Sequence, residues 1–175
     1  PTLIACGTPE QKAFHLPRIV RGEVIWCQGF SEPGAGSDLA SLKTRGTIDG
    51  DALVIQGQKI WSSFADVADY QELLVRTDPA ARTSAALSWV ICPMNAPGIT
   101  VRPIRTMAGV FKFCEVFYDG VWVPLANVVG GVNNGWRTAM STLAFERGTS
   151  SLALLLALLQ RVERLLRACP GDRAM

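Results

Sequence analysis

From Val24 onward, the sequence is divided into short apolar or alternating runs, each closed by Gly, Pro, Asp or Asn. Runs of this length with such frequent turn residues are typical of an all-β unit. So many short strands in succession predict a barrel or a sandwich. We expect strands at Val24–Ser31, Leu42–Ile48, Ala52–Gln56, Gln58–Ser62, Tyr70–Thr77, Ala86–Met94, Thr100–Ile104, Lys112–Tyr118 and Val121–Val123.

Three dipeptides predict the turns between these strands. Asp49-Gly50 lies between two strand-like runs and indicates a hairpin, because Asp-Gly readily adopts the positive φ of a tight turn. Pro97-Gly98 and Asp119-Gly120 are expected to end strands in the same way.

Helical patterns flank the β region on both sides. Residues 8–22 predict a short helix with Thr8 as N-cap and Pro9 at its first position, limited by Pro17 and Gly22. After Gly135 the apolar period becomes helical, and one long helix is expected through Leu165, ending near Pro170-Gly171. Gly148 should weaken that helix locally, by about 1 kcal/mol relative to Ala. The apolar face of residues 136–168 has no partner within the chain, so self-association is expected.

Composition excludes several classes of function. The 17 basic residues are scattered and nearly balanced by 15 acidic ones, so nucleic acid is not an expected partner. The longest apolar run, Leu152–Leu159, is far short of the roughly 18–20 residues that a membrane span needs. The start of the chain, Pro1–Ala5, lacks the features of a signal peptide and an initiating Met, so we expect a piece of a longer protein.

Cysteine and histidine usage bounds the chemistry further. The 5 cysteines form no C-x-x-C pair and are odd in number, which favours a reducing, cytoplasmic compartment over a disulfide framework. His15 is the only histidine, so metal sites built on several histidines are excluded and no metal is expected. We expect His15 itself to have an ordinary surface or capping role.

The segment from Trp26 to Asp38 is the most informative for function. A strand runs into a Gly-rich turn, where backbone N–H groups can approach a ligand without obstruction from a Cβ. The turn is not a dinucleotide fingerprint, because Leu39 stands where a third Gly would be, and no Gly-Lys-Ser/Thr follows. On the residues alone, an ordinary β-turn remains the alternative.

Four sequence blocks nevertheless resemble the acyl-CoA dehydrogenase family, in family order and over nearly the whole chain. They are the Ser-Glu-Pro-Gly-Ala-Gly-Ser-Asp segment at 31–38, Gln-Gly-Gln-Lys-Ile-Trp-Ser-Ser at 56–63, the strand-like segments at 97–104 and 115–124, and Gly135-Trp136 followed by Leu143–Arg147. The resemblance implies a mainly-β fold with α flanks, the β-barrel of the family's middle domain followed by one long helix of a truncated bundle. Residues 1–23 would end an N-terminal helical domain, 24–131 would form the barrel and 132–175 would begin a C-terminal helical domain.

The resemblance also implies where FAD would lie. The strand that includes Gln28 would line the flavin ring, Ser31 would bond its polar edge, Trp61 would pack beside it, and Ser63 would lie near its reactive edge. For Trp61 a place in the barrel core remains the alternative, and for Ser63 a role without a ligand. The implied cofactor-binding set is Gln28, Gly29, Phe30, Ser31, Gly36, Ser37, Trp61, Ser62 and Ser63.

For the substrate, the resemblance implies contacts from Ser37 to the thioester arm and from Arg147 to the CoA portion. Glu146 matches the position at which some branched-chain and long-chain members carry the catalytic base. In most members the base is a Glu further along, in a domain that this chain does not contain. Arg147 as a solvated helix residue and Glu146 as an exposed helix residue remain the alternatives. Ala144 replaces an Asp of medium-chain relatives, which changes the expected CoA contacts.

The implied activity is FAD-dependent dehydrogenation of acyl-CoA to trans-2-enoyl-CoA in fatty acid metabolism, with electron-transferring flavoprotein as acceptor and a homodimer or homotetramer as the full-length assembly. This chain alone is expected to bind FAD weakly or not at all and to be inactive. Two alternatives stay open. One is a non-catalytic module that binds FAD or acyl-CoA or serves assembly, and the other is a relative of acyl-CoA or nitroalkane oxidases.

Overall fold

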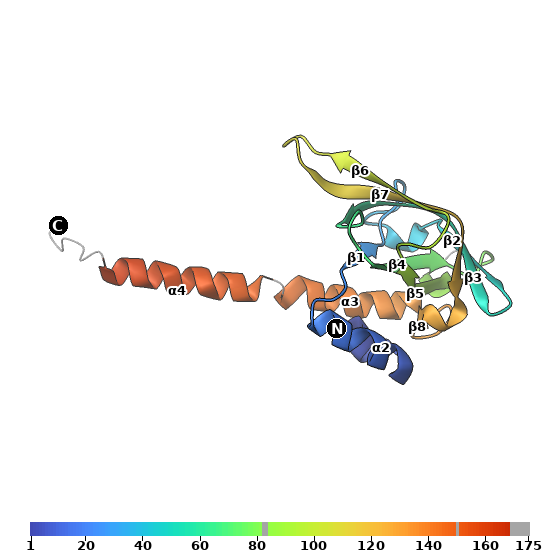
Figure 1. The fold of residues 1–175 in the computed structure, drawn as a ribbon, viewed down its shortest axis with the longest axis horizontal. Helices are drawn as coiled ribbons and strands as arrows, with labels where there is room; N and C mark the ends of the chain where they lie inside the picture. Colours follow the sequence, from blue (N-terminus) through green and yellow to red (C-terminus); the bar gives the residue numbers. More distant parts are fainter. Residues whose placement is uncertain (82–83, 150, 169–175) are drawn as a thin grey trace.

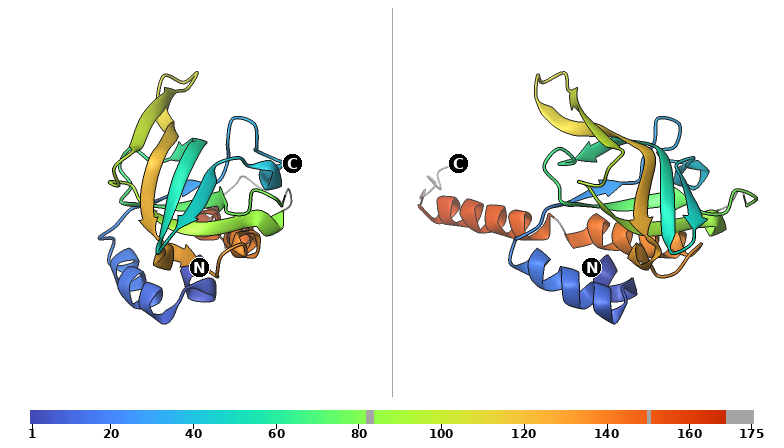
Figure 2. Two further views of the ribbon diagram at one scale, coloured as in Figure 1. Left: turned by 90° about the vertical axis from the view of Figure 1, so that its right-hand side faces the viewer. Right: turned by 45° about the vertical axis from the view of Figure 1, so that its right-hand side comes forward.

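The computed structural model describes residues 1–81, 84–149 and 151–168. Its centre is an eight-stranded, strongly curled sheet in the order β6-β7-β3-β2-β4-β5-β8, with β1 paired to β4 (Figures 1 and 2). The strands are β1 Trp26–Gly29, β2 Arg45–Asp49, β3 Ala52–Ser63, β4 Tyr70–Arg76, β5 Leu87–Pro93, β6 Ile99–Arg105, β7 Phe111–Pro124 and β8 Val128–Val129.

Two apolar clusters lie on the two faces of this sheet. The inner one includes Leu53, Leu73 and Val90, all fully buried. The outer one includes Leu74 and Trp89 and lies between the sheet and the helices. Successive residues of β4 and β5 therefore alternate between two covered faces, as expected for strands that are buried on both sides.

The expected strand pattern is largely confirmed, with two corrections at its breaks. The Asp49-Gly50 hairpin is present between β2 and β3, and the Pro97-Gly98 turn separates β5 from β6. The runs 52–56 and 58–62, however, form the single strand β3. Likewise 112–118 and 121–123 form the single strand β7, because Asp119-Gly120 is accommodated opposite Gln56 as a bulge and not as a turn. The two-residue strand β8 was not expected.

The N-terminal segment forms α1 Thr2–Cys6 and α2 Pro9–Val20. Thr8 caps α2 as predicted: its hydroxyl accepts from the Gln11 N–H at 3.2 Å, and the Gln11 side chain accepts from the Thr8 N–H at 3.0 Å. The helix continues past Pro17 and ends before Gly22, whose φ is +67°.

The position of His15 corrects an expectation. It is buried on α2 and its ring makes edge contacts with Phe14, Trp26 and Tyr70. Burial lowers the pKa of His15, with a smaller effect of nearby Arg18. The residue therefore joins α2 to the edge of the sheet and has no surface role.

The segment after Gly135 forms α3 Gly135–Thr149 and α4 Leu152–Ala168, where one helix was expected. Ser150 between them, Cys169 and the expected end at Pro170-Gly171 lie outside the described residues. The helix α3 lies against β5, and its first residue approaches so closely that a Cβ on Gly135 would be 2.4 Å from the Ser88 carbonyl carbon. The helix α4 extends away from the sheet with leucines such as Leu154 and Leu158 exposed (Figure 1).

Within the described ranges, no helix is long and apolar enough to cross a membrane. Nor does this part of the chain bring three His, Cys, Asp or Glu side chains close enough to hold a metal ion.

Candidate active site

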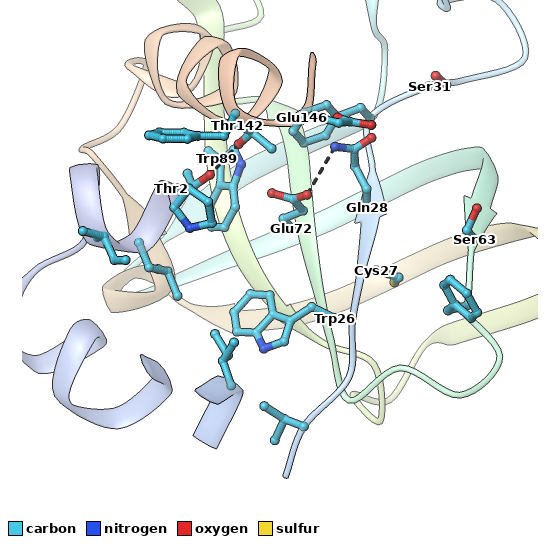
Figure 3. A pocket seen from close by; sticks show the side chains of 18 of the residues that line it. Thr2, Trp26, Cys27, Gln28, Ser31, Ser63, Glu72, Trp89, Thr142 and Glu146 are labelled. Atoms are coloured by element: carbon cyan, nitrogen blue, oxygen red, sulfur yellow. Dashed lines mark hydrogen bonds between the residues drawn. The ribbon is translucent and has the colours of Figure 1, made fainter. Parts of the chain in front are cut away.

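A pocket of about 860 Å³ lies where the N-terminal helices, the strand β1, the end of β3 and the helix α3 meet (Figure 3). Its wall is mostly apolar, with a few polar side chains. This combination is typical of sites for small molecules and cofactors. The lining residues are Pro1, Thr2, Leu3, Ile4, Leu16, Ile19, Val20, Val24, Trp26, Cys27, Gln28, Phe30, Ser31, Ile60, Trp61, Ser63, Phe64, Glu72, Trp89, Thr142, Phe145 and Glu146.

The strand β1 provides one wall through its alternation. Trp26 and Gln28 are half-buried and lie on the helix side, whereas Cys27 and Gly29 are buried. Burial raises the pKa of Cys27 to about 12, so this residue remains a thiol and is not a nucleophile. A Cβ on Gly29 would lie 2.5 Å from the side chain of Gln71, so glycine is needed for β1 to pack this closely.

The Gly-rich turn after β1 is fixed by a buried ion pair. The Glu32 carboxylate accepts from Lys59 Nζ at 2.8 Å and from the backbone N–H groups of Lys43 and Thr44 at 2.6 and 2.8 Å. Lys59 Nζ also donates to the Phe30 carbonyl at 3.0 Å. The start of the turn is thus tied to β3 by charge-assisted hydrogen bonds.

Burial and charge act in opposite directions on the pKa values of both members of this pair. Burial lowers the pKa of Lys59 to about 8, although the Glu32 charge opposes the change. Burial also acts to raise the pKa of Glu32, but the charge and hydrogen bond of Lys59 outweigh it and hold that pKa below its usual value. The pair is therefore ionised at neutral pH.

A polar group of side chains lies on the wall between β4 and α3. Gln28 and Glu72 are register neighbours on the parallel strands β1 and β4, and Gln28 Nε2 donates to Glu72 Oε1 at 3.2 Å. Thr142 on α3 interacts with Glu72, and its hydroxyl is 2.7 Å from that of Thr2. Burial raises the pKa of Glu72 to about 7, and the nearby charge of Glu146 adds to the shift.

The rim near the end of β3 carries two exposed aromatic residues in strained backbone. Two residues of β3, Ile60 and Trp61, stand opposite the single residue Glu115, which makes a bulge. Trp61 has φ of +63° and is 56% exposed, and Phe64 has φ of +62° and is 59% exposed. Positive φ is uncommon for such bulky residues, and strain of this kind is concentrated at functional sites.

The structure brings together six of the residues predicted for cofactor or catalysis. Gln28, Phe30, Ser31, Trp61, Ser63 and Glu146 all line the pocket. Trp61 is thus at the rim and not in the barrel core.

The other predicted residues lie elsewhere. Gly29 and Ser62 are buried outside the pocket, and the Ser62 hydroxyl has no hydrogen-bond partner among the described residues. Gly36 and Ser37 are on an exposed loop beyond the pocket lining. Arg147 belongs to α3, but its side chain lies outside the described part of the chain.

Sequence reasoning missed the polar side chains Glu72 and Thr142. A signal for Glu72 was available. It precedes Leu73-Leu74-Val75, a run without polar alternation that indicates a strand covered on both faces. A Glu in such a strand is buried and requires a partner or a function.

Comparisons with known proteins point to one family. Residues 27–121 match the family model described as acyl-CoA dehydrogenase, middle domain. The acyl-CoA dehydrogenase IpdE1 of Mycobacterium tuberculosis is 44% identical over 194 residues, which cover 100% of this chain and 50% of that protein. FadE34 of the same organism is 48% identical over 84% of this chain and 21% of its own length. The chain spans about half or less of the length of these curated relatives.

Solved structures show the same fold. A steroid ACAD, Tcur3481-Tcur3483, superposes with a TM-score of 0.83 at 42% identity, covering 96% of this chain and 44% of that one. The ChsE4-ChsE5 complex from Mycobacterium tuberculosis gives a TM-score of 0.80 at 41% identity, covering 99% of this chain and 45% of that one. Together with the eight-stranded sheet, these matches confirm the predicted mainly-β fold with a helical segment after it.

Proposed function

Because the chain belongs to the acyl-CoA dehydrogenase family, we propose that it forms the flavin-binding and acyl-binding core of an enzyme that converts acyl-CoA to trans-2-enoyl-CoA. The observation that carries this proposal is the composition of one pocket. A carboxyl group, Glu146, borders an apolar cavity that also has aromatic residues and hydroxyls at its rim. An acyl group and a flavin ring that fill this cavity would exclude water from the place where the α-proton is removed.

The rim fits the ring of FAD. Trp61 and Phe64 offer exposed flat apolar surfaces, and Ser31 and Ser63 provide hydroxyls for the polar edge of a flavin. Gln28 and Phe30 would complete the wall on the β1 side. Bound FAD supplies the acceptor for the hydride that leaves the β-carbon. Gly29 and Ser62 would act indirectly, through the close packing of β1 and β3, and not as direct contacts.

Glu146 would remove the α-proton of the thioester. It is an exposed residue of α3 at the pocket, where a thioester entering from solvent would meet it, whereas Glu72 is shielded between β4 and α3 (Figure 3). The exposed loop with Gly36 and Ser37 lies outside the acyl pocket, which suits contacts with the long polar part of CoA. Arg147, next to Glu146 on α3, would contribute to the same part of the ligand.

We further propose an acyl group that contains a ring. Two similar proteins carry names that fit: the steroid ACAD described above, and a cyclohexane-1-carbonyl-CoA dehydrogenase of Geobacter metallireducens that is 37% identical over 83% of this chain.

The same proposal includes an assembly, an electron acceptor and a compartment. The exposed leucines of α4 would be covered by a further helix or subunit, and ChsE4-ChsE5 is itself a complex of two proteins. Electron-transferring flavoprotein is the proposed acceptor. The four described cysteines are free, which supports the cytoplasm as the proposed compartment.

The test uses the complete protein that carries this chain. It is loaded with FAD, its visible absorption is recorded, and a saturated acyl-CoA such as cyclohexane-1-carbonyl-CoA or octanoyl-CoA is added without oxygen. Bleaching of the flavin band, with slow recovery in air, is expected. Fast recovery in air would assign an oxidase, and bound but unbleached flavin would assign a non-catalytic module.

A further inference from the structure

The pocket contains a polar group of side chains that proton abstraction does not use. Glu72, Gln28 and Thr142 come from β4, β1 and α3 and lie on one stretch of an otherwise apolar wall (Figure 3). Each borders the cavity. We define these three residues as the inner polar cluster.

The strand register places the first two members beside each other. Gln28 pairs with Glu72 in the parallel β1–β4 ladder, so the two side chains are on the same face, and their hydrogen bond is 3.2 Å. The Gln28 amide thereby uses one N–H, while its carbonyl oxygen remains an acceptor. Thr142 interacts with Glu72 from the opposite side and is held at 2.7 Å by Thr2.

A hydrocarbon ligand would be a poor match for this wall. An acyl group without polar atoms would cover the Glu72 carboxyl and the Gln28 amide and exclude the water that otherwise solvates them. Buried polar groups are costly unless they form hydrogen bonds, so a site built in this way rejects ligands that lack the matching group. A dehydrogenase for plain acyl chains would require only apolar residues at these positions.

We propose that the inner polar cluster recognises an oxygen substituent, a hydroxyl or a keto group, on the acyl part of the substrate, with Glu72 as the residue that determines this specificity. The inference rests on the proposed acyl-CoA dehydrogenase function. A substrate hydroxyl can donate to the Glu72 carboxylate or to the Gln28 carbonyl oxygen. A substrate keto oxygen can accept from the protonated Glu72 carboxyl.

Glu146 is the other acidic group that faces this cluster, and it is on the same helix as Thr142. Its charge favours the protonated form of Glu72. The cluster therefore offers a donor and an acceptor to the ligand.

The test compares ligands that differ only by one hydroxyl. The probes are (cyclohexylthio)acetyl-CoA, in which sulfur replaces the β-carbon so that no hydride can leave, and its derivatives with a hydroxyl on ring carbon 2, 3 or 4. Dissociation constants are measured by calorimetry on the complete, FAD-loaded protein. We expect at least one hydroxy derivative to bind about tenfold more tightly than the plain probe.

Substitution of the carboxyl should remove that preference. Glu72→Leu is expected to bind the plain probe at least as tightly as every hydroxy derivative. Glu72→Gln should have a ratio of plain to hydroxy dissociation constants between those of wild type and Glu72→Leu. Glu10→Leu, on the exposed first turn of α2, is the matched control and should keep the wild-type ratio. Since each result is a ratio within one protein, differences in folding or FAD content cancel.

A wild-type protein that binds the plain probe as tightly as each derivative would overturn the inference and leave the dehydrogenase function intact. The same holds if both Glu72 variants keep the wild-type preference. A protein that binds none of the four thioesters would remove the proposed function, and the inference with it.

Discussion

Glu72 on β4 and Glu146 on α3 present two carboxyl groups to one pocket. Their surroundings differ. Glu72 is covered by β1 and α3, and burial together with the Glu146 charge raises its pKa to about 7, whereas Glu146 is exposed to solvent. Neighbouring carboxyls in unlike environments generally divide acid, base and binding roles between them. Since Glu146 is proposed to remove the proton and Glu72 to recognise the acyl group, separate predictions follow for the two residues.

Glu146→Gln is expected to slow anaerobic flavin bleaching by saturated acyl-CoA by about 10²- to 10⁴-fold, the usual range for loss of a general base. Binding of (cyclohexylthio)acetyl-CoA should change little, because the amide has nearly the same shape as the carboxylate. Stopped-flow absorbance and calorimetry measure the two effects separately. Glu10→Gln serves as the control, and an unchanged bleaching rate in Glu146→Gln would assign the base to another residue.

Glu72 should make the stability of the protein depend on pH. Its pKa rises from 4.5 to about 7 on folding, so between these values the folded state holds a proton that the unfolded state releases. The stabilising contribution is complete below about pH 4.5 and is lost as pH rises through about 7, with an upper limit of about 3.4 kcal/mol.

Urea unfolding at pH 5 and pH 8 measures this effect. The change in the free energy of unfolding between the two pH values is compared in wild type and Glu72→Gln, because the contributions of all other carboxyl groups are the same in both proteins. The wild type should lose more free energy of unfolding than the variant between the two pH values. Equal losses would show that Glu72 titrates normally in the folded protein.

Lys59→Met is expected to lower the free energy of unfolding by about 3–5 kcal/mol, because it leaves the buried Glu32 carboxylate without its counter-charge. Lys43→Met, a change at an exposed lysine near the same turn, should stay within about 0.5 kcal/mol of wild type. Urea unfolding measures both. The double variant Lys59→Met/Glu32→Gln should recover part of the loss, and failure to do so would mean that Lys59 acts mainly by filling space.

Trp61→Gly should separate stability from cofactor binding. Glycine removes the strain of a positive φ at an exposed position, so the free energy of unfolding should change by less than about 1 kcal/mol. FAD affinity of the complete protein, followed by flavin fluorescence, should fall severalfold. Trp122→Gly, in the exposed part of β7, should show the reverse. Its free energy of unfolding should fall by about 1 kcal/mol, and its FAD affinity should be unchanged. Equal FAD affinities in the two variants would contradict the place given to Trp61.

The strands could be predicted from the sequence because turn residues mark their ends. Asp49-Gly50 and Pro97-Gly98 are turns in the structure, as local chemistry requires. Asp119-Gly120 misleads for a physical reason: the same positive φ that permits a tight turn also permits a bulge, and pairing of β7 with β3 on both sides decides between them. Such long-range pairing is not encoded in the dipeptide.

The site was predictable only in part. Short motifs identified Ser31, Trp61 and Ser63, which the fold places around one pocket. Local sequence could not show that Ser62, beside them, would be buried away from it, because the bulge in β3 resets the alternation of side chains. Glu72 belongs to the pocket only because β1 pairs with β4 and α3 covers both, which no local pattern states.

The hydrogen bond between Thr2 and Thr142 joins the second residue of the chain to the last helix that packs on the sheet. Contacts between such distant residues require closure of a very long loop, and they form late in folding. During synthesis the barrel strands are all available before α3 leaves the ribosome, since chains are made from the N-terminus. The barrel can therefore fold first, and α1 has to wait for its partner on α3. The pocket is consequently completed in a final docking step, after the scaffold has formed.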